Sequence, residues 1–137
     1  MLYAITHGQV SREAARTEEI MYLITSTQAL RGAGLAIVAS NRHAELEYAD
    51  LTDADEALDR DDFVDWDLMR ARYWSNTPDD PDRKERRQAV CLVHPGVPWD
   101  LIEEVVTKTA EGRDRVAAAL AERGSAARAF VERDWYF

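Results

Sequence analysis

The sequence lacks the features that mark membrane, secreted and disulfide-stabilised proteins. No apolar run approaches the ~20 residues needed to cross a bilayer, and the opening MLYAITHGQV has neither the basic nor the apolar region of a signal peptide. We therefore expect a cytoplasmic protein. Cys91 is the single cysteine, which excludes an internal disulfide and a cysteine-based zinc site. Its place in an apolar run predicts a packed side chain rather than a nucleophile.

Motifs for several common chemistries are also missing. The three histidines are isolated, without the close spacing of metal ligands, so no bound metal is expected. The segment RGAGLAIV lacks the Lys-Ser/Thr of a phosphate loop and the three-glycine spacing of a dinucleotide fold, and instead predicts a helix stop before a strand. Ser26, Ser40 and Ser75 lack the glycines of a nucleophile elbow, so nothing indicates a hydrolase.

Charge is present but unevenly distributed. The 137 residues, 46% hydrophobic and 31% charged, fit one soluble globular domain. Between Asn41 and Trp66, ten acids face only Arg42 and Arg60, so nearly all of the formal net charge of -9 lies there. This stretch predicts a solvated surface. The charge argues against a protein that coats DNA broadly, yet it leaves room for a polyanionic ligand elsewhere.

Apolar runs and turn residues divide the chain into short elements, with no internal repeat and no interdomain linker. Strands are expected at residues 1–6, 20–25, 35–40, 88–94 and 105–109, with a strand-like aromatic tail at 127–137. Helices are expected at residues 26–30, 53–58, 66–74, 100–104 and 113–123, and loops at 11–19 (or a short helix) and 75–87. This order predicts the α+β fold class with an antiparallel or mixed sheet.

Capping signals support several of these helices. Thr52, followed three residues later by Asp55, resembles a capping box. Ser26 and Asp65 can cap the helices that follow them through their side-chain oxygens. Gly124 is expected to end the strongest helix, which is rich in alanine.

The loop from Trp74 to Arg87 is the one segment that suggests a ligand. Its basic residues, with one from the preceding helix, are Arg72, Arg83, Lys84, Arg86 and Arg87. With the neighbouring aromatic rings of Tyr73 and Trp74, they can hold single-stranded nucleic acid, because cations meet phosphates and rings stack on bases. The alternative is internal neutralisation by the acids of the same loop, which are Asp79, Asp80, Asp82 and Glu85.

Long motifs then point to a known family. The segment WDLMRARYWSNTPDDPDRKERRQA, followed by LVHPGVPWDLI and the terminal WYF, resembles the C-terminal two thirds of the DarT family. These are bacterial toxins that use NAD to ADP-ribosylate bases of single-stranded DNA, paired with an antitoxin that removes ADP-ribose. MLYAIT, YLITSTQAL and HAE extend the resemblance over essentially the whole chain, and ARYWSNTPDDPDRKERRQA is its most specific part.

The resemblance implies a fold, a co-substrate and a binding surface. The fold would be an ADP-ribosyltransferase-like split β-sheet core with short helices, opening into a cleft for NAD, whose binding residues are left unassigned here. In the family, the loop equivalent to Trp74 to Arg87 faces the nucleic acid and leads into the strand of the catalytic glutamate. The residues expected to contact DNA are therefore Tyr73, Trp74, Arg83, Lys84, Arg86 and Arg87.

One departure from the family concerns catalysis. Val90 stands in RQAVCLV where the family motif Gln-Ala-Glu has its glutamate. That carboxylate is needed because the nicotinamide–ribose bond breaks through an oxocarbenium-like state, and losing such a group costs roughly 10²- to 10⁴-fold in rate. Glu85 lies five residues earlier and Asp100 ten later, so neither is a natural substitute. We expect a pseudoenzyme without a catalytic residue and without bound NAD.

A second departure concerns the start of the chain. Family members carry an additional N-terminal portion with much of the NAD pocket, so we expect residues 1–137 to be a single DarT-like domain lacking that portion. Uncovered sheet edges would then favour self-association, an antitoxin or a completing protein chain. The alternatives are an active DNA ADP-ribosyltransferase completed by another chain, and a partner-binding protein with no nucleotide role.

Overall fold

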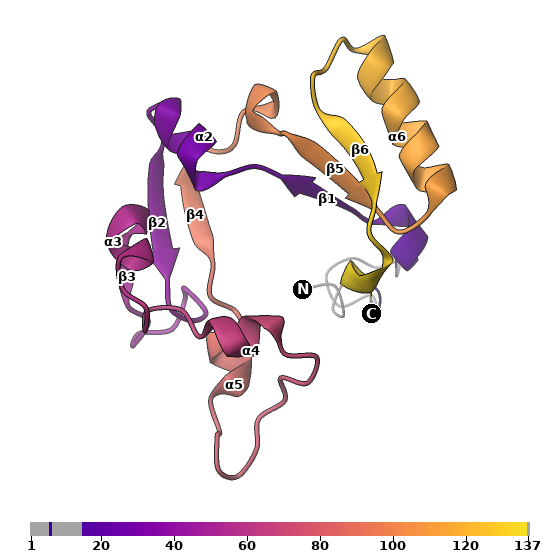
Figure 1. Cartoon of the computed structure of the whole chain (residues 1–137). Coiled ribbons are helices and arrows are strands. Elements are labelled where there is room, and N and C mark those ends of the chain that lie inside the picture. The colour runs from indigo at the N-terminus through magenta and orange to yellow at the C-terminus, as the bar shows by residue number, and fades with distance from the viewer. Residues whose placement is uncertain (1–5, 7–14, 137) are drawn as a thin grey trace. The chain divides into compact units, whose positions relative to one another are not determined.

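The computed structural model describes residue 6 and residues 15–136, and Figure 1 draws the whole chain. The strand expected at residues 1–6 lies outside the described residues except for Thr6, whose backbone is helical. The chain divides into two compact units, one formed by Met1–Ser26 with Val97–Phe137 and the other by Thr27–Gly96. Each unit has its own three-stranded sheet, and the single domain expected over the chain stays a prediction.

The first unit is built on a mixed sheet with the strand order β1-β5-β6. β1 (Met21–Ile24) runs antiparallel to the central β5 (Glu104–Thr107), and β6 (Arg128–Val131) runs parallel to β5. α6 (Ala110–Glu122) connects β5 to β6, as a parallel pair requires. Three short 3-10 turns flank these elements, namely η1 (Thr17–Glu19), η2 (Trp99–Leu101) and η3 (Arg133–Trp135).

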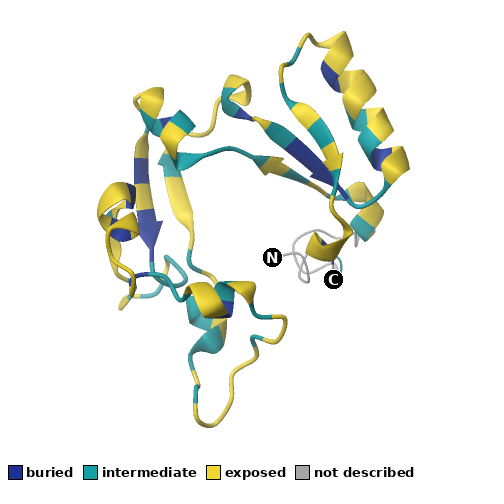
Figure 2. Cartoon of the chain, viewed as in Figure 1, coloured by how far each residue is buried: buried dark blue, intermediate teal, exposed yellow. Residues whose placement is uncertain are grey.

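The core of the first unit lies between α6 and the sheet. Figure 2 shows buried positions on β5 and on α6. The buried cluster and the side chains packed against it are Ile102, Val105, Leu120, Val116, Ala127 and Ala129. Burying a large aliphatic side chain of this kind stabilises a fold by about 1.5–3 kcal/mol, so this layer holds α6 in place.

The ends of α6 follow local signals in the sequence. Thr109 Oγ1 accepts a hydrogen bond from the Gly112 amide at 3.0 Å, so the helix begins at Ala110, three residues before its predicted start. Gly124, with φ of 64°, adopts the left-handed conformation that favours glycine and follows the helix as predicted. None of the helices in the described part of the chain is long and apolar enough to cross a membrane.

The aromatic C-terminal residues pack only in part. Tyr136 is buried and donates its hydroxyl to the Val106 carbonyl at 2.7 Å. Tyr22 donates its hydroxyl to the Trp135 carbonyl at 3.1 Å, and the two rings meet edge to face with centroids 5.7 Å apart. Trp135 is nevertheless exposed. Of the strand-like tail expected at residues 127–137, only β6 is a strand, and Phe137 lies outside the described residues.

The second unit has an antiparallel sheet with the strand order β3-β2-β4. β2 (Ala36–Ser40) lies between β3 (Leu51–Asp53) and β4 (Cys91–His94). Its helices are α2 (Thr27–Gly32), α3 (Ala54–Leu58), α4 (Trp66–Arg70) and α5 (Arg83–Arg86). Its buried apolar side chains are Leu30, Ile37, Ala39, Ala54, Ala57, Phe63 and Leu68. With one mixed and one antiparallel sheet, the predicted α+β class is confirmed.

One predicted helix cap, one predicted helix end and one predicted loop were wrong in this unit. Thr52 does not cap α3, because it pairs with β2 as part of β3, and Asp53 accepts the Asp55 amide at 2.9 Å in its place. α4 ends at Arg70 rather than Trp74, because the backbone becomes extended at Ala71. The stretch expected to be loop, residues 75–87, contains α5.

Two further predictions need correction at β4 and β5. β4 begins at Cys91 rather than at residue 88, because the backbone after α5 keeps a helical turn, with the Ala89 amide donating to the Arg86 carbonyl at 3.1 Å. The helix expected at residues 100–104 is only the 3-10 turn η2, since Glu104 already pairs within β5. The strand expected near 105–109 is therefore confirmed but starts one residue earlier.

Gly112 marks the close approach of α6 to β5. A Cβ there would lie 3.2 Å from Thr109 Oγ1 and 3.3 Å from Thr107 Cβ. We expect Gly112→Ala to lower the free energy of unfolding by about 1–2 kcal/mol in chemical denaturation, because overpacking outweighs the gain in helix propensity. Gly32→Ala, where nothing lies within 4 Å of the added Cβ, is the control and should not destabilise. Equal stability of the two variants would contradict the close packing.

Candidate functional site

The loop between α4 and α5 is closed by its own hydrogen bonds. At its tip, the Thr77 amide donates to the Asp80 carbonyl at 3.0 Å, and the Asp80 amide donates back to the Thr77 carbonyl at 3.2 Å. Nearer its base, Asn76 Oδ1 accepts the Lys84 amide at 2.8 Å. Figure 1 shows this loop between α4 and α5. Side-chain and turn contacts thus order a segment that has no regular structure.

Arg86 is the centre of an ion-pair cluster beneath the loop. Its Nε donates to Asp65 Oδ2 at 3.2 Å, its Nη2 reaches both carboxylate oxygens of Asp80 at 3.0 Å, and its Nη1 pairs with Asp82. Only 23% of the Arg86 side chain is exposed. Asp65 also caps α4 by accepting the Leu68 amide at 2.9 Å. The guanidinium therefore ties the start of α4 to the loop and to α5.

Two further arginines complete the cluster. Arg83 Nη1 donates to Asp80 Oδ2 at 3.1 Å, and its Nη2 donates to the Tyr73 carbonyl at 2.9 Å. Arg42 Nη1 lies 3.4 Å from Asp82 Oδ2. Three guanidinium groups therefore face three carboxylates, so the internal neutralisation that the loop's acids allowed is confirmed for Asp80 and Asp82.

The pKa of the Asp80 carboxyl is lowered within this cluster. Burial alone would raise that pKa, but the hydrogen bonds and positive charges of Arg86 and Arg83 together outweigh burial. A carboxyl with a lowered pKa contributes stability above its ordinary pKa, and that stability is lost as the pH falls through the lowered value. Asp80 is therefore ionised, and its contacts are intact, throughout the neutral range.

Other residues of the loop remain open to solvent. Tyr73 is 80% exposed, and the Arg72 guanidinium lies 6.0 Å from its ring centroid. Lys84 is exposed, and its ammonium group forms no ion pair within the described residues. Trp74 is half-buried. Arg87 points inward toward Met69 Sδ at 3.8 Å, and its buried Nε has no hydrogen-bond partner in the described part of the chain.

The six residues expected to contact DNA thus differ in what they offer, since Trp74 and Arg87 are half-buried. Tyr73 and Lys84 present free side chains to solvent. Arg83 and Arg86 lie in ion pairs, so direct contact with a phosphate would require them to exchange carboxylates. All six residues lie in one continuous segment of the second unit, and whether each touches DNA stays a prediction.

The backbone of Val90 is held by Ser40. The Ser40 amide donates to the Val90 carbonyl at 2.9 Å, and the Val90 amide donates to Ser40 Oγ at 3.1 Å. Ser40 is 1% exposed, whereas Val90 is 41% exposed. Val90 was expected within the strand at residues 88–94, but it precedes β4 and its side chain is exposed. Sequence reasoning missed this role of Ser40, since no motif marks a serine that anchors a distant strand.

Cys91 is exposed, so the prediction of a packed cysteine was also wrong. β4 is largely exposed, with only Val93 of its four residues partly buried, so the side chain of Cys91 lacks packing partners over its face of the sheet among the described residues. Partial desolvation nevertheless raises the pKa of the Cys91 thiol. Because the thiolate is the nucleophile, Cys91 is poorly suited to attack at neutral pH.

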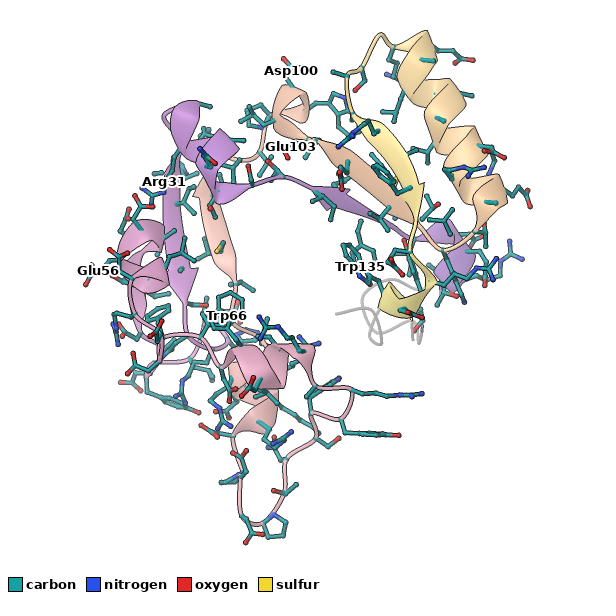
Figure 3. All side chains as sticks on the ribbon, in the orientation of Figure 1. Arg31, Glu56, Trp66, Asp100, Glu103 and Trp135 are labelled. Carbon is teal, nitrogen blue, oxygen red and sulfur yellow. The ribbon has the colours of Figure 1, made fainter. Side chains whose placement is uncertain are left out.

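The surroundings of the loop include an acidic hollow and no evident metal cage. A hollow of about 510 Å³ lies beside α4, next to Trp66, which is labelled in Figure 3. The residues that line it are Asp61, Asp62, Val64, Asp65, Trp66, Asp67 and Arg86. Its carboxylates disfavour phosphate groups. Within residues 15–136, no cluster of three His, Cys, Asp or Glu side chains is suited to a metal ion.

Comparisons with known proteins agree with these features. A family model described as single-stranded DNA thymidine ADP-ribosyltransferase, DarT, matches residues 1–137. A DNA ADP-ribosyl transferase of Thermus sp. (strain 2.9) is 34% identical over 139 residues, which cover 100% of this chain and 63% of that protein. The chain therefore spans less than two thirds of this relative's length.

Solved structures agree with the sequence matches. Thermus sp. 2.9 DarT in complex with NAD+ has a TM-score of 0.84 at 33% identity, covering 99% of this chain and 66% of that chain. The same protein in complex with ADP-ribosylated ssDNA has a TM-score of 0.84 at 32% identity, covering 99% and 63%. The expected ADP-ribosyltransferase-like fold is thereby confirmed.

The ion-pair cluster predicts unequal roles for two arginines of this region. Arg86→Ala should lower the free energy of unfolding by roughly 1–3 kcal/mol, because Asp65 loses its ion-pair partner and Asp80 and Asp82 each lose one of two. Arg72→Ala, which removes an exposed cation over a ring, should cost less than about 1 kcal/mol. Urea denaturation measures both. A cost for Arg86→Ala no larger than that for Arg72→Ala would contradict the central position of Arg86.

Proposed function

Because the chain belongs to the DarT family of single-stranded DNA thymidine ADP-ribosyltransferases, we propose that it is a DarT-like domain that binds single-stranded DNA and does not itself transfer ADP-ribose. The binding surface is the segment of residues 71–87, which comprises the loop between α4 and α5 together with α5. The observation that carries this proposal is the exposed Tyr73 ring on a loop that also carries the free Lys84 ammonium group. We further place the chain in a toxin–antitoxin pair, in the role that the family resemblance implies.

DNA binding is supported by the chemistry of the free groups. A base can stack on the Tyr73 ring, and each such contact contributes about 1–3 kcal/mol. Lys84 and Arg72 can meet the phosphates on either side. The other residues of the surface mainly hold its conformation through contacts within the protein. They are Trp74, Arg83, Arg86 and Arg87. Two solved DarT structures point the same way, because that relative is described in complex with NAD+ and with ADP-ribosylated ssDNA.

Loss of catalysis is supported by the side chain at position 90. Ser40 holds the backbone there, and the side chain faces solvent, which suits a position that presents a functional group. An isopropyl group carries no charge to stabilise an oxocarbenium-like state. Glu85, the nearest acid before it in the chain, already accepts a hydrogen bond from Tyr48 Oη at 2.7 Å. NAD would be the co-substrate of the family reaction rather than a resident cofactor.

We also propose that the chain associates with another polypeptide, whether a second copy, an antitoxin or a chain that completes the NAD cleft. β1 supports this, because it is an edge strand among the described strands and exposes Met21 and Leu23. Apolar edge strands commonly pair with another chain. An active enzyme completed by a second chain, and a partner-binding protein without a nucleotide role, are the alternatives that the same surface supports.

Incubation with labelled NAD and single-stranded oligonucleotides tests the catalytic proposal. The protein should modify bases no more than a no-protein control does, because Val90 offers no carboxylate. Val90→Glu tests whether this side chain is the defect, and a gain of about 10²-fold or more over Val90→Gln would place it there. If Val90→Glu stays inactive, the defect extends beyond position 90. Modification by the unaltered protein would refute inactivity and favour the completed enzyme.

Titration of a labelled single-stranded oligonucleotide by fluorescence anisotropy tests the binding proposal. Tyr73→Ala should weaken binding by about 5- to 100-fold through loss of stacking. Lys84→Ala should weaken it and reduce the salt slope of log K by about 0.7. Arg133→Ala, an exposed cation in the first unit, changes the net charge equally and should leave binding unchanged. Unaltered affinity in both loop variants would refute the assignment of the loop.

A further inference from the structure

Asp80 and Asp79 are neighbouring acids in the proposed DNA-binding loop with different surroundings. The Asp80 carboxylate is shared by the Arg83 and Arg86 guanidinium groups. Asp79 is exposed, and its side chain has no hydrogen bond or ion pair to any residue of the described chain. We propose that Asp80 is a positioning residue, whose carboxylate braces the loop so that Tyr73 and Lys84 are presented to single-stranded DNA. This inference rests on the proposed function.

Arg83 links Asp80 to the aromatic contact. One guanidinium nitrogen of Arg83 donates to Asp80 Oδ2 at 3.1 Å, and the other donates to the Tyr73 carbonyl at 2.9 Å. A carboxylate matches the planar fork of a guanidinium and holds its orientation. Without Asp80, the Arg83 guanidinium would lose the carboxylate that fixes its orientation, and with it the geometry of its hydrogen bond to the Tyr73 carbonyl. The exposed ring therefore depends on a carboxylate seven residues away in the chain.

Arg86 links the same carboxylate to the helix that carries Lys84. Arg86 holds both oxygens of Asp80 at 3.0 Å and also reaches Asp65 at the start of α4. Lys84 lies two residues before Arg86 on α5, and its amide is tied across the loop to Asn76 Oδ1. Asp80 thereby connects the arm that bears Tyr73 with the arm that bears Lys84.

The energetic reason for such a brace is the shortage of other contacts. α5 contains no buried residue, and the loop before it has no regular structure. Loops of this kind are normally mobile, and ordering them on binding weakens affinity. An aromatic ring held at 80% exposure in advance avoids part of that ordering cost. The ion pairs replace the apolar packing that would otherwise give the loop its shape.

A bracing role of Asp80 and simple charge repulsion predict opposite effects of Asp80→Asn on the affinity for single-stranded DNA. If acids near the DNA act only by repulsion, replacing either aspartate with asparagine should strengthen binding. If Asp80 braces the loop, Asp80→Asn should weaken binding although it removes a negative charge. Asp79→Asn is the matched control, because it makes the same chemical change one residue away at a side chain with no anchoring role.

The experiment compares Asp79→Asn and Asp80→Asn in the full chain with a labelled single-stranded oligonucleotide. We expect Asp79→Asn to bind as tightly as the unaltered protein or a few-fold tighter, and Asp80→Asn to bind about 5- to 20-fold more weakly. The salt slope of Asp80→Asn should stay unchanged, since Lys84 still meets its phosphate in the bound state. Asp80→Glu, which keeps the charge, should recover part of the affinity. Equal or tighter binding by Asp80→Asn than by Asp79→Asn would overturn the proposal.

Hydrogen–deuterium exchange separates this inference from the proposed function. In the free protein, Asp80→Asn should speed exchange of the Lys84 and Asp80 amides, whereas Asp79→Asn should not, and exchange in α6 should be equal in both. Unchanged exchange in Asp80→Asn would overturn the brace whether or not DNA binds. If no variant and no unaltered protein binds the oligonucleotide, the proposed function fails, and faster exchange in Asp80→Asn would still establish the brace itself.

Discussion

The interaction on which the candidate surface depends is the Arg86 guanidinium shared by three carboxylates. It joins Asp65, which caps α4, to Asp80 in the loop and Asp82 at the start of α5. Apolar packing is scarce there, since α4 buries only Leu68 and α5 buries nothing. Ion pairs of this kind gain little net free energy after desolvation, but they exclude other arrangements because each unpaired charge would be costly. The cluster therefore determines the shape of the loop more than its stability.

This cluster changes how the basic composition of the loop relates to nucleic-acid binding. Counted along the sequence, the segment around residues 72–87 has five cations, but Arg83 and Arg86 are neutralised by aspartates. The proposed affinity for single-stranded DNA would then depend on a few free groups held in a defined geometry rather than on a diffuse positive field. In the proposed function, the net charge of -9 therefore matters less than the exposed groups that the paired arginines hold in place.

The sequence-based predictions were accurate for elements set by local interactions and failed for elements that depend on contacts between residues far apart in the chain. The helix α6 was predicted well, because its alanines and Gly124 act through neighbouring backbone. β2 was found from an apolar run, whereas β3 was missed because its three residues form a strand only by pairing with β2. α5 was missed because two prolines and several aspartates favour a loop locally. The contacts of Arg86 to Asp65 and of the N-cap residue Asp82 to Arg42 join residues far apart along the chain.

The sequence by itself determined the α+β class, the family, the acidic stretch and the valine at position 90, since these depend on residue identity and local pattern. The tertiary structure alone decided which charges are paired, that the Tyr73 ring is exposed, and that the buried Ser40 anchors the backbone of Val90. The physical reason is that pairing and exposure depend on contacts between residues as far apart as 40 and 90. Chain folding creates such contacts, and no local pattern encodes them.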